Sequence, residues 1–264
     1  MSALLSAHGL SRHYPLPREG LLARRRTLVA LDKVSLGLDE GKTLGIVGES
    51  GSGKSTLARL LVGLETPQAG EVRFMGQRIS DRPEREIRPL RRHFQMVFQD
   101  PFGSLDPRMQ VLDSVAEPLD HAEPWLAAAD RRDRVAAMLE RVGLGAAAML
   151  RYPHQFSGGQ RQRIAIARAL VTSPKLVVAD EPVSALDVSV QAQILNLLLD
   201  IRHEFGLAMV FISHDLGVIR YLSDRVMVMQ QGRVVEEGET EAVFADPREA
   251  YTRRLIEAMP RLAV

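Results

Sequence analysis

The stretch TLGIVGESGSGKSTLARLL, residues 43–61, decides the fold of this chain. It begins with an apolar run at 43–47 that has the length of a buried strand. It continues into a helical pattern that we expect to run from Ser52 to Leu64, because Thr66-Pro67 stops it. A buried strand that passes through a glycine-rich loop into a helix predicts an α/β protein with a phosphate-binding loop.

The loop itself satisfies the pattern G-x-x-x-x-G-K-[ST]. Glycines allow backbone N–H groups to approach phosphate oxygens without a Cβ in the way, and the start of the following helix favours an anion. Lys54 adds a compact positive charge for the β- and γ-phosphates, and the Ser55 hydroxyl can coordinate Mg²⁺. The predicted phosphate-binding residues are Gly48, Glu49, Ser50, Gly51, Ser52, Gly53, Lys54, Ser55 and Thr56.

Strand-like apolar runs alternate with helical patterns along the rest of the chain. The predicted strands are 34–38, 71–75, 95–99, 176–180, 207–213 and 225–230, and the predicted helices are 110–119, 125–142, 158–172, 188–204 and 215–222. This alternation predicts a mainly parallel α/β sheet. The helical run in the middle of the chain predicts an inserted lobe, in which we expect Trp125 and Met138 to pack in the core. The arginine-rich segment 78–92 predicts a solvated loop with a short helix.

Polar side chains follow three of the predicted strands. Asp180 and Glu181 come at the end of the apolar run LVVAD, and ligands bind at the carboxyl ends of strands in α/β sheets. Asp180 is suited to Mg²⁺, and Glu181 is placed to orient and deprotonate a water that attacks the γ-phosphate. Gln99, at the end of the strand predicted at 95–99, could ligate the metal or position the water. His214 could contact the γ-phosphate, or it could be an ordinary loop or cap residue.

The composition excludes several kinds of protein. The 264 residues include no cysteine, so the chain has no disulfide, thiol nucleophile or cysteine-ligated metal. The 34 basic and 33 acidic residues almost cancel, which argues against a nucleic-acid partner because such proteins usually carry a basic excess. No apolar run approaches the roughly 18 residues that span a bilayer, and the N-terminus lacks the pattern of a signal peptide. We therefore expect a soluble or peripheral, cytoplasmic protein.

A second loop precedes another helix at FSGGQRQRIAIARAL, residues 156–170. Ser157 occupies an N-cap position and two glycines follow, so this is either a second anion-binding helix start or an ordinary capped helix. The segment closely resembles the signature motif of ABC ATPases, with Phe156 in place of the commoner leucine. The resemblance covers nearly the full chain, in which six motifs occur in the order typical of that family.

The resemblance implies that this chain binds ATP and Mg²⁺. Gly48–Thr56 is similar to the Walker A loop, and 177–180 is similar to the Walker B strand. Tyr14 resembles the aromatic residue that stacks on adenine. The metal ligands that the resemblance implies are Ser55, Gln99 and Asp180.

The resemblance also implies how hydrolysis is shared between subunits. Gln99 looks like the glutamine of the Q-loop, Glu181 like the catalytic glutamate, and His214 like the switch histidine. Two such domains would form a head-to-tail dimer in which each ATP is capped by the signature motif of the other subunit. The residues that would act on the partner's ATP are Ser157, Gly158, Gly159, Gln160 and Asp187, the last belonging to the D-loop SALD.

The fold implied by the resemblance is a P-loop NTPase with a RecA-like core. An N-terminal antiparallel β subdomain and the core would occupy 1–99 and 161–264. A helical subdomain that ends with the signature motif would be inserted at 100–160, and 240–264 would be a short C-terminal extension.

A finer resemblance points to the ATPase subunits of peptide and nickel importers. It rests on the segments 97–108, 180–198 and 245–260, and PVSALDVS resembles the second of two paired, non-identical ATPase subunits. The implied partners are two permease subunits, a second homologous ATPase subunit and, indirectly, a solute-binding protein, at the cytoplasmic face of the cell membrane. The cysteine-ligated cluster that some longer relatives carry near the C-terminus is not expected here.

The sequence leaves open alternatives for the cargo and for the kind of ATPase, and some of them are favoured over others. Peptides are the favoured cargo, and nickel or another small solute is the alternative. An exporter or regulatory ATPase of the same family is disfavoured by the importer-like segments 97–108 and 180–198. An ABC ATPase acting on DNA or ribosomes is disfavoured because there is one Walker A loop and no long heptad run. A non-enzymatic binding module would require a broken Lys54 or Glu181, and both are intact.

Overall fold

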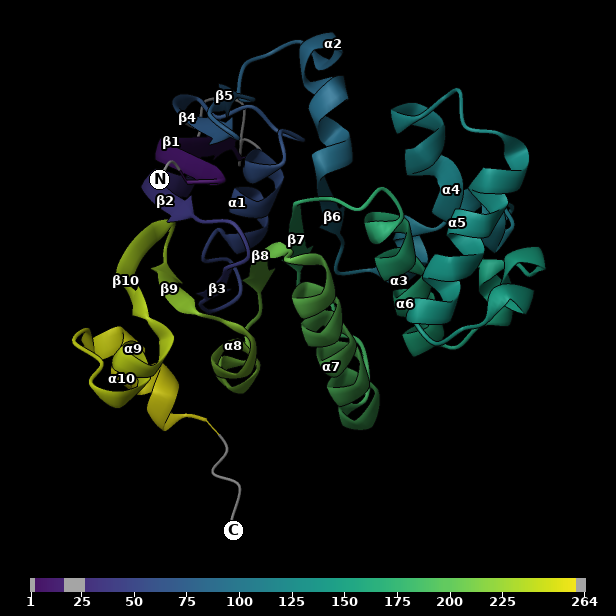
Figure 1. Ribbon diagram of the computed structural model, residues 1–264. Coiled ribbons are helices and arrows are strands. Elements are labelled where there is room, and N and C mark those ends of the chain that lie inside the picture. Colours follow the sequence, from purple (N-terminus) through teal and green to yellow (C-terminus); the bar gives the residue numbers. More distant parts are fainter. Residues whose placement is uncertain (1–2, 17–26, 260–264) are drawn as a thin grey trace. The chain divides into compact units, whose positions relative to one another are not determined.

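The computed structural model describes residues 3–16 and 27–259, and the chain forms two compact units (Figure 1). The first unit combines the described residues up to Arg82 with those from Val210 onward, and the second unit runs from Pro83 to Met209. Each unit contains both strands and helices. The first unit is therefore assembled from the two ends of the chain, and the second from its middle.

Four strands of the first unit form an antiparallel sheet in the order β2-β1-β4-β5. Leu5 pairs with Leu38 on one side and with Phe74 on the other, and all three side chains are buried. This sheet confirms the expected N-terminal antiparallel β subdomain. The strands are β1 Leu5–Pro15, β2 Thr27–Leu38, β4 Ala69–Phe74 and β5 Gln77–Arg78.

A second set of strands in the first unit leads into the glycine-rich loop. Strand β3, Thr43–Val47, is buried along its whole length and pairs in parallel with β9, Arg225–Gln230. Strand β10, Arg233–Glu239, pairs antiparallel with β9. Continuous burial of an apolar strand is what a parallel sheet covered on both faces requires. The helices of this unit are α1 Lys54–Leu61, α8 Leu216–Leu222, α9 Thr240–Ala245 and α10 Ala250–Glu257.

The second unit contains a parallel strand pair and most of the helices. Strand β6, Phe94–Val97, pairs with β7, Leu176–Asp180, and β8, Ala208–Ile212, leads the chain back into the first unit. The α-helices are α2 Glu84–Ile87, α3 Pro101–Ser104, α4 Val111–Ala122, α5 Ala128–Arg141, α6 Gly158–Leu170 and α7 Val188–Phe205. Shorter 3-10 helices span Arg88–His93, Ala146–Leu150 and Pro153–Gln155.

The predicted strands and helices are present, and most of their ends differ by a few residues, whereas β2 begins at Thr27 rather than at residue 34. The helix after the glycine-rich loop begins at Lys54 rather than Ser52, because Gly53 has a left-handed backbone with φ of 102°. The strand predicted at 95–99 ends at Val97, so Gln99 lies beyond it. The sequence pattern does not predict strands β1, β5 and β10.

The expected core position of Trp125 is wrong, because its side chain is 76% exposed. Helix α5 begins only at Ala128, so Trp125 precedes the helix whose buried stripe is Val135, Met138 and Leu139. Met138 is buried, as expected. Within residues 3–16 and 27–259, no helix combines the length and the apolar character needed to cross a membrane.

Candidate functional site

The glycine-rich loop between β3 and α1 approaches neighbouring backbone too closely for side chains at two positions. Gly53 has φ of 102°, and a Cβ there would lie 2.3 Å from the Ala30 carbonyl oxygen. A Cβ on Gly48 would lie 2.1 Å from the Met229 carbonyl oxygen. Real Cβ atoms essentially never come within 3.0 Å of a neighbour, so both positions require glycine.

Lys54 is buried at the start of α1, and its ammonium group is held by the loop. Its Nζ donates hydrogen bonds to the carbonyl oxygens of Gly48 at 2.7 Å and Glu49 at 2.9 Å. Only 5% of the surface of Lys54 is exposed. A positive charge is thus kept beside the N-terminus of an eight-residue helix, and both features favour a phosphate.

Hydroxyl groups add further donors to the same loop. Ser52 is 4% exposed, and its Oγ makes no hydrogen bond within the described part of the chain. A buried hydroxyl without a partner is unfavourable, and a phosphate oxygen could satisfy it. Ser55 and Thr56 lie half-buried in the first turn of α1.

Backbone hydrogen bonds fix the loop to its surroundings. The Gly232 N–H, in the turn between β9 and β10, donates to the Ser52 carbonyl oxygen at 3.0 Å. The Gly232 carbonyl in turn accepts from the Asp32 N–H at 2.9 Å, and Asp32 lies in β2. The phosphate loop is therefore attached by hydrogen bonds to elements from both ends of the chain.

Tyr14 lies near the end of β1, and its ring already has a partner. The Arg12 guanidinium lies 5.0 Å from the ring centroid, within cation–π range. The Tyr14 hydroxyl donates to Glu65 Oε2 at 2.5 Å, and Glu65 also forms an ion pair with Arg12 at 3.3 Å. Stacking of adenine on this ring would therefore use the face opposite Arg12 or displace it. Arg12 and Glu65 are neighbours of this ring that no local sequence pattern indicates.

Gln99 and Glu181 lie together in the second unit. The Gln99 Nε2 donates to Glu181 Oε2 at 3.2 Å. They meet because β6 and β7 are parallel neighbours, and each residue follows the carboxyl end of its strand. Asp180, the last residue of β7, is 5% exposed.

Glu181 has an unusual backbone. Its φ is 45°, in the left-handed region that non-glycine residues rarely adopt. The Ser184 N–H and hydroxyl hold this turn by donating to the Glu181 carbonyl oxygen at 3.3 and 3.1 Å. Such backbone strain is often found at functional sites, because the surrounding structure must maintain it against its energetic cost.

Ser157 caps helix α6, as its sequence position indicates. Its Oγ accepts from the Gln160 N–H at 3.4 Å, and the Gln160 side chain accepts from the Ser157 N–H at 3.0 Å. This reciprocal pair is a capping box. Gly159 is buried against α7, where a Cβ would lie 2.4 Å from Val190 Cγ1, while Gly158 is half-buried.

Asp187 performs the same role for helix α7. Its Oδ1 accepts from the Val190 N–H at 3.0 Å and from the Ser189 hydroxyl at 2.7 Å. These bonds, the Ser189 hydroxyl first, lower the pKa of the Asp187 carboxyl. Asp187 is exposed, so a charged carboxylate is presented at the surface of the second unit.

His214 follows β8 and is exposed in the first unit. The preceding residue, Ser213, donates its N–H to the Ile46 carbonyl oxygen of β3 at 3.2 Å. The next residue, Asp215, caps α8 by accepting from the N–H groups of Gly217 and Val218. His214 is thus held between two fixed neighbours in the unit that carries the phosphate loop.

The predicted magnesium ligands are all oxygen donors. Ser55 supplies a hydroxyl in the first unit, and Gln99 and Asp180 supply an amide and a carboxylate in the second. Oxygen donors of these kinds are ligands that Mg²⁺ takes, usually one or two carboxylates together with substrate phosphates. No group of three or more His, Asp or Glu side chains that could hold a metal occurs in the described parts of the chain.

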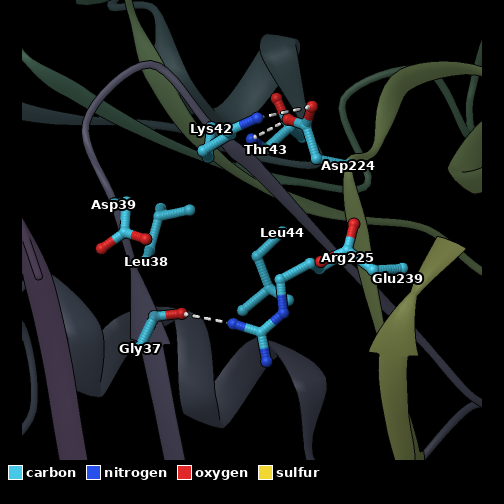
Figure 2. A pocket seen from close by; sticks show the side chains of 9 residues that line it. All are labelled: Gly37, Leu38, Asp39, Lys42, Thr43, Leu44, Asp224, Arg225 and Glu239. Atoms are coloured by element: carbon cyan, nitrogen blue, oxygen red, sulfur yellow. Dashed lines mark hydrogen bonds and ion pairs between the residues drawn. The ribbon is translucent and has the colours of Figure 1, made fainter.

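A small pocket of about 100 Å³ lies at the other end of β3 from the phosphate loop. Figure 2 shows Lys42 and the Thr43 N–H directed at Asp224, at 3.7 and 2.7 Å, and Arg225 donating to the Gly37 carbonyl oxygen. These contacts tie the starts of β3 and β9 together. None of the predicted site residues lines this pocket.

Comparison with known proteins identifies close relatives. Residues 31–184 match the family model described as ABC transporter. The chain is 52% identical over 261 residues to the dipeptide transport ATP-binding protein DppF of Haemophilus influenzae, with 98% of this chain and 79% of that protein covered. It is also 52% identical to the glutathione import ATP-binding protein GsiA of Escherichia coli, where 97% of this chain matches 41% of that protein.

Solved structures are similar in fold as well. The ATP-binding cassette MJ0796, in a dimeric post-hydrolysis state bound to ADP and Pi, has a TM-score of 0.80 and 31% identity, over 89% of this chain and 98% of that one. The protein cbiO1 from Clostridium perfringens, part of the ABC transporter complex cbiONQ, has a TM-score of 0.78 and 30% identity, over 93% and 92% of the two chains.

Proposed function

Because the chain belongs to the ABC transporter family, we propose that it is the ATP-hydrolysing subunit of an importer for dipeptides or other short peptides. ATP hydrolysis is the activity of this family. The peptide assignment is supported by relatives at about half identity that are described as dipeptide or di/tripeptide transport ATP-binding proteins. A relative described as a glutathione import protein supports the same class of cargo, since glutathione is itself a short peptide.

In the first unit, residues Gly48–Thr56 bind the phosphates of ATP. Lys54 leaves the carbonyl oxygens of Gly48 and Glu49 and pairs with the β- and γ-phosphates, which are much stronger partners for an ammonium group. Tyr14 contacts the adenine ring, and His214 contacts the γ-phosphate. Mg²⁺, when bound by Ser55, Gln99 and Asp180, would neutralise charge on the phosphate oxygens.

In the second unit, Glu181 is the general base that deprotonates the attacking water. Gln99 supports this role because its amide donates a hydrogen bond to the Glu181 carboxylate. That bond orients the Glu181 carboxylate, which is the group that takes the proton from water. The contact between Gln99 and Glu181 is the observation that carries the proposal of an active hydrolase rather than a binding module.

The capped starts of α6 and α7 act on the ATP of another subunit. Ser157, Gly158, Gly159 and Gln160 would cap the γ-phosphate bound to a second, homologous ATPase subunit, and Asp187 would link the two sites. The head-to-tail dimer that this needs is consistent with the dimeric state described for MJ0796. Removal of the γ-phosphate by hydrolysis would weaken the dimer, as in other nucleotide switches.

The remaining partners are two permease subunits in the cell membrane, with a solute-binding protein acting on the other side. We assign the permease contact to the helical subdomain at 100–160, near Gln99 to Arg108, at the cytoplasmic face. The exposed Trp125 lies in this segment and gives it an apolar side chain available to a partner. The alternative cargo is nickel or another small solute, carried by an importer of the same family.

The test is Glu181→Gln in the complex assembled with its partner ATPase and permeases. Glutamine keeps the size of the side chain but cannot accept a proton, so ATP binding should persist while hydrolysis falls about 10²-fold or more. The matched control is Glu204→Gln in the same unit, where Glu204 forms an exposed ion pair with Arg141. Turnover near the wild-type rate in the Glu181 variant would remove Glu181 from this role.

A further inference from the structure

The C-terminal helix α10 is firmly anchored to strand β10. The buried carboxylate of Glu236, in β10, accepts the N–H groups of Arg248 at 2.8 Å and Glu249 at 3.1 Å, just before the helix begins. Thr252, in the first turn of α10, is fully buried. Burial alone would raise the pKa of Glu236, but the Thr252 hydroxyl and the two N–H groups outweigh it and lower the pKa of this carboxyl. The negatively charged Glu236 carboxylate therefore holds the N-terminus of α10, where a negative charge is favourable.

This docking brings Tyr251 to the phosphate loop. The Tyr251 side chain is 7% exposed, and its hydroxyl accepts a hydrogen bond from the Glu49 N–H at 3.1 Å. The two residues are separated by 202 positions in the sequence, but both belong to the first unit.

The contact falls on the peptide bond that Lys54 also uses. The peptide between Gly48 and Glu49 offers its N–H to the Tyr251 hydroxyl and its C=O to the Lys54 ammonium group, at 2.7 Å. Its orientation is thus fixed at both ends. When Lys54 moves to a phosphate, one of these two bonds is lost, and the Tyr251 bond remains to hold the peptide.

We propose that Tyr251 is a positioning residue for ATP, which keeps the first peptide of the phosphate loop in its binding orientation. This inference rests on the proposed binding of ATP by Gly48–Thr56. A loop that is held in place before the ligand arrives loses less conformational entropy on binding, so the ligand binds more tightly. The role is to organise the loop, and Tyr251 takes no part in the chemistry.

The direct test is Tyr251→Phe in the full-length chain, with ATP affinity measured by titration of a fluorescent ATP analogue in the presence of Mg²⁺. Phenylalanine keeps the buried ring and removes only the hydroxyl. Loss of the hydrogen bond between the Tyr251 hydroxyl and the Glu49 N–H should weaken ATP binding about threefold to tenfold. In the assembled complex the KM for ATP should rise by a similar factor, while kcat changes less than about twofold. The matched control is Tyr221→Phe, which removes the hydroxyl of a largely exposed tyrosine in the same unit and should leave affinity unchanged.

A second measurement uses the reciprocity of coupled binding. If Tyr251 couples α10 to the loop, ATP must in turn stabilise α10, so hydrogen exchange of its backbone amides should slow when ATP is added. Tyr251→Phe should reduce this protection. Glu236→Gln, which touches α10 and not the loop, should weaken ATP binding in the same direction, because it loosens the helix that carries Tyr251.

The results separate this inference from the proposed function. Normal ATP binding by the wild type, with unchanged affinity in Tyr251→Phe, would overturn the positioning role and leave the ATPase assignment intact. A wild-type chain that does not bind ATP would overturn both. Equal losses of affinity and kcat in the folded Tyr251 variant would also overturn it, since they indicate general damage rather than positioning.

Discussion

Two adjacent glycines of the capped helix start offer a sharp test of the packing in the second unit. Gly158 and Gly159 are both in the first turn of α6, but they face different neighbours. A Cβ on Gly159 would lie 2.4 Å from Val190 Cγ1 in α7, whereas a Cβ on Gly158 would lie 3.5 Å from Leu186, in ordinary contact. Gly159→Ala and Gly158→Ala therefore add the same methyl group to a crowded position and to an open one.

The expected difference follows from two opposing terms. Alanine in place of glycine stabilises a helix by up to about 1 kcal/mol, and this gain is available to both variants. At Gly159 the contact must lengthen from 2.4 Å to at least 3.4 Å, the lower limit of ordinary contact, which is a shift of 1.0 Å. Val190 is β-branched and cannot rotate away easily, so the helices must separate, and such overpacking costs about 1–3 kcal/mol. We expect Gly159→Ala to be less stable than Gly158→Ala by about 1–3 kcal/mol.

The assay is urea unfolding of the two variants and the wild type, followed by far-UV circular dichroism without nucleotide. The rescue variant Gly159→Ala/Val190→Ala removes the methyl group that collides, so the double-mutant cycle should show coupling of about 0.5–3 kcal/mol. Equal stability of Gly158→Ala and Gly159→Ala, with no coupling to Val190, would refute the packing of α6 against α7 described here.

Three further predictions concern the first unit and the isolated chain. Gly51→Ala and Gly53→Ala both place a Cβ on a residue with positive φ, but only the Cβ at position 53 would approach backbone, at 2.3 Å from the Ala30 carbonyl oxygen. In urea unfolding, Gly53→Ala should therefore be less stable than Gly51→Ala. Equal losses of unfolding free energy in the two variants would contradict this. Because the folded pKa of Glu236 is lowered from 4.5, its contribution to stability is present above that pH and is lost as pH falls through the lowered value. The gap in melting temperature between wild type and Glu236→Gln should therefore narrow below pH 4.5, and a gap that widens on acidification would contradict the sign. Finally, the chain without partners should be mostly monomeric in light scattering, and it should release phosphate from ATP only slowly. Hydrolysis by the chain alone that is as fast as hydrolysis by its complex would contradict the proposal that each ATP site needs the signature motif of a second subunit.

The local features of the fold could be predicted because neighbouring residues determine them. The loop at Gly48–Thr56 follows from glycine spacing, and the caps at Ser157 and Asp187 follow from residue type and position. The placement of Gln99 and Glu181 at the carboxyl ends of two strands could be anticipated as well, whereas the pairing of those strands, β6 and β7, is visible only in the structure.

Features that depend on distant pairing could not be predicted in this way. Strand β1 contains Gly9 with φ of 61° and has register shifts, so its alternation of buried and exposed residues is interrupted. Trp125 is a large apolar residue that helical spacing places on the buried stripe, yet the helix begins after it. The bond between Tyr251 and Glu49 depends on how α10 docks on β10, which no local pattern records.

The most direct test of the central claim is ATP-dependent uptake of a labelled dipeptide into lipid vesicles that contain the assembled importer, with the ATPase site facing the added ATP. The account predicts uptake that requires this chain, and that falls with hydrolysis when Glu181→Gln replaces the wild type. An importer that takes up nickel and does not take up the labelled dipeptide would contradict the proposed cargo. Peptide uptake that proceeds unchanged with the Glu181 variant would contradict the claim that this chain supplies the energy for transport.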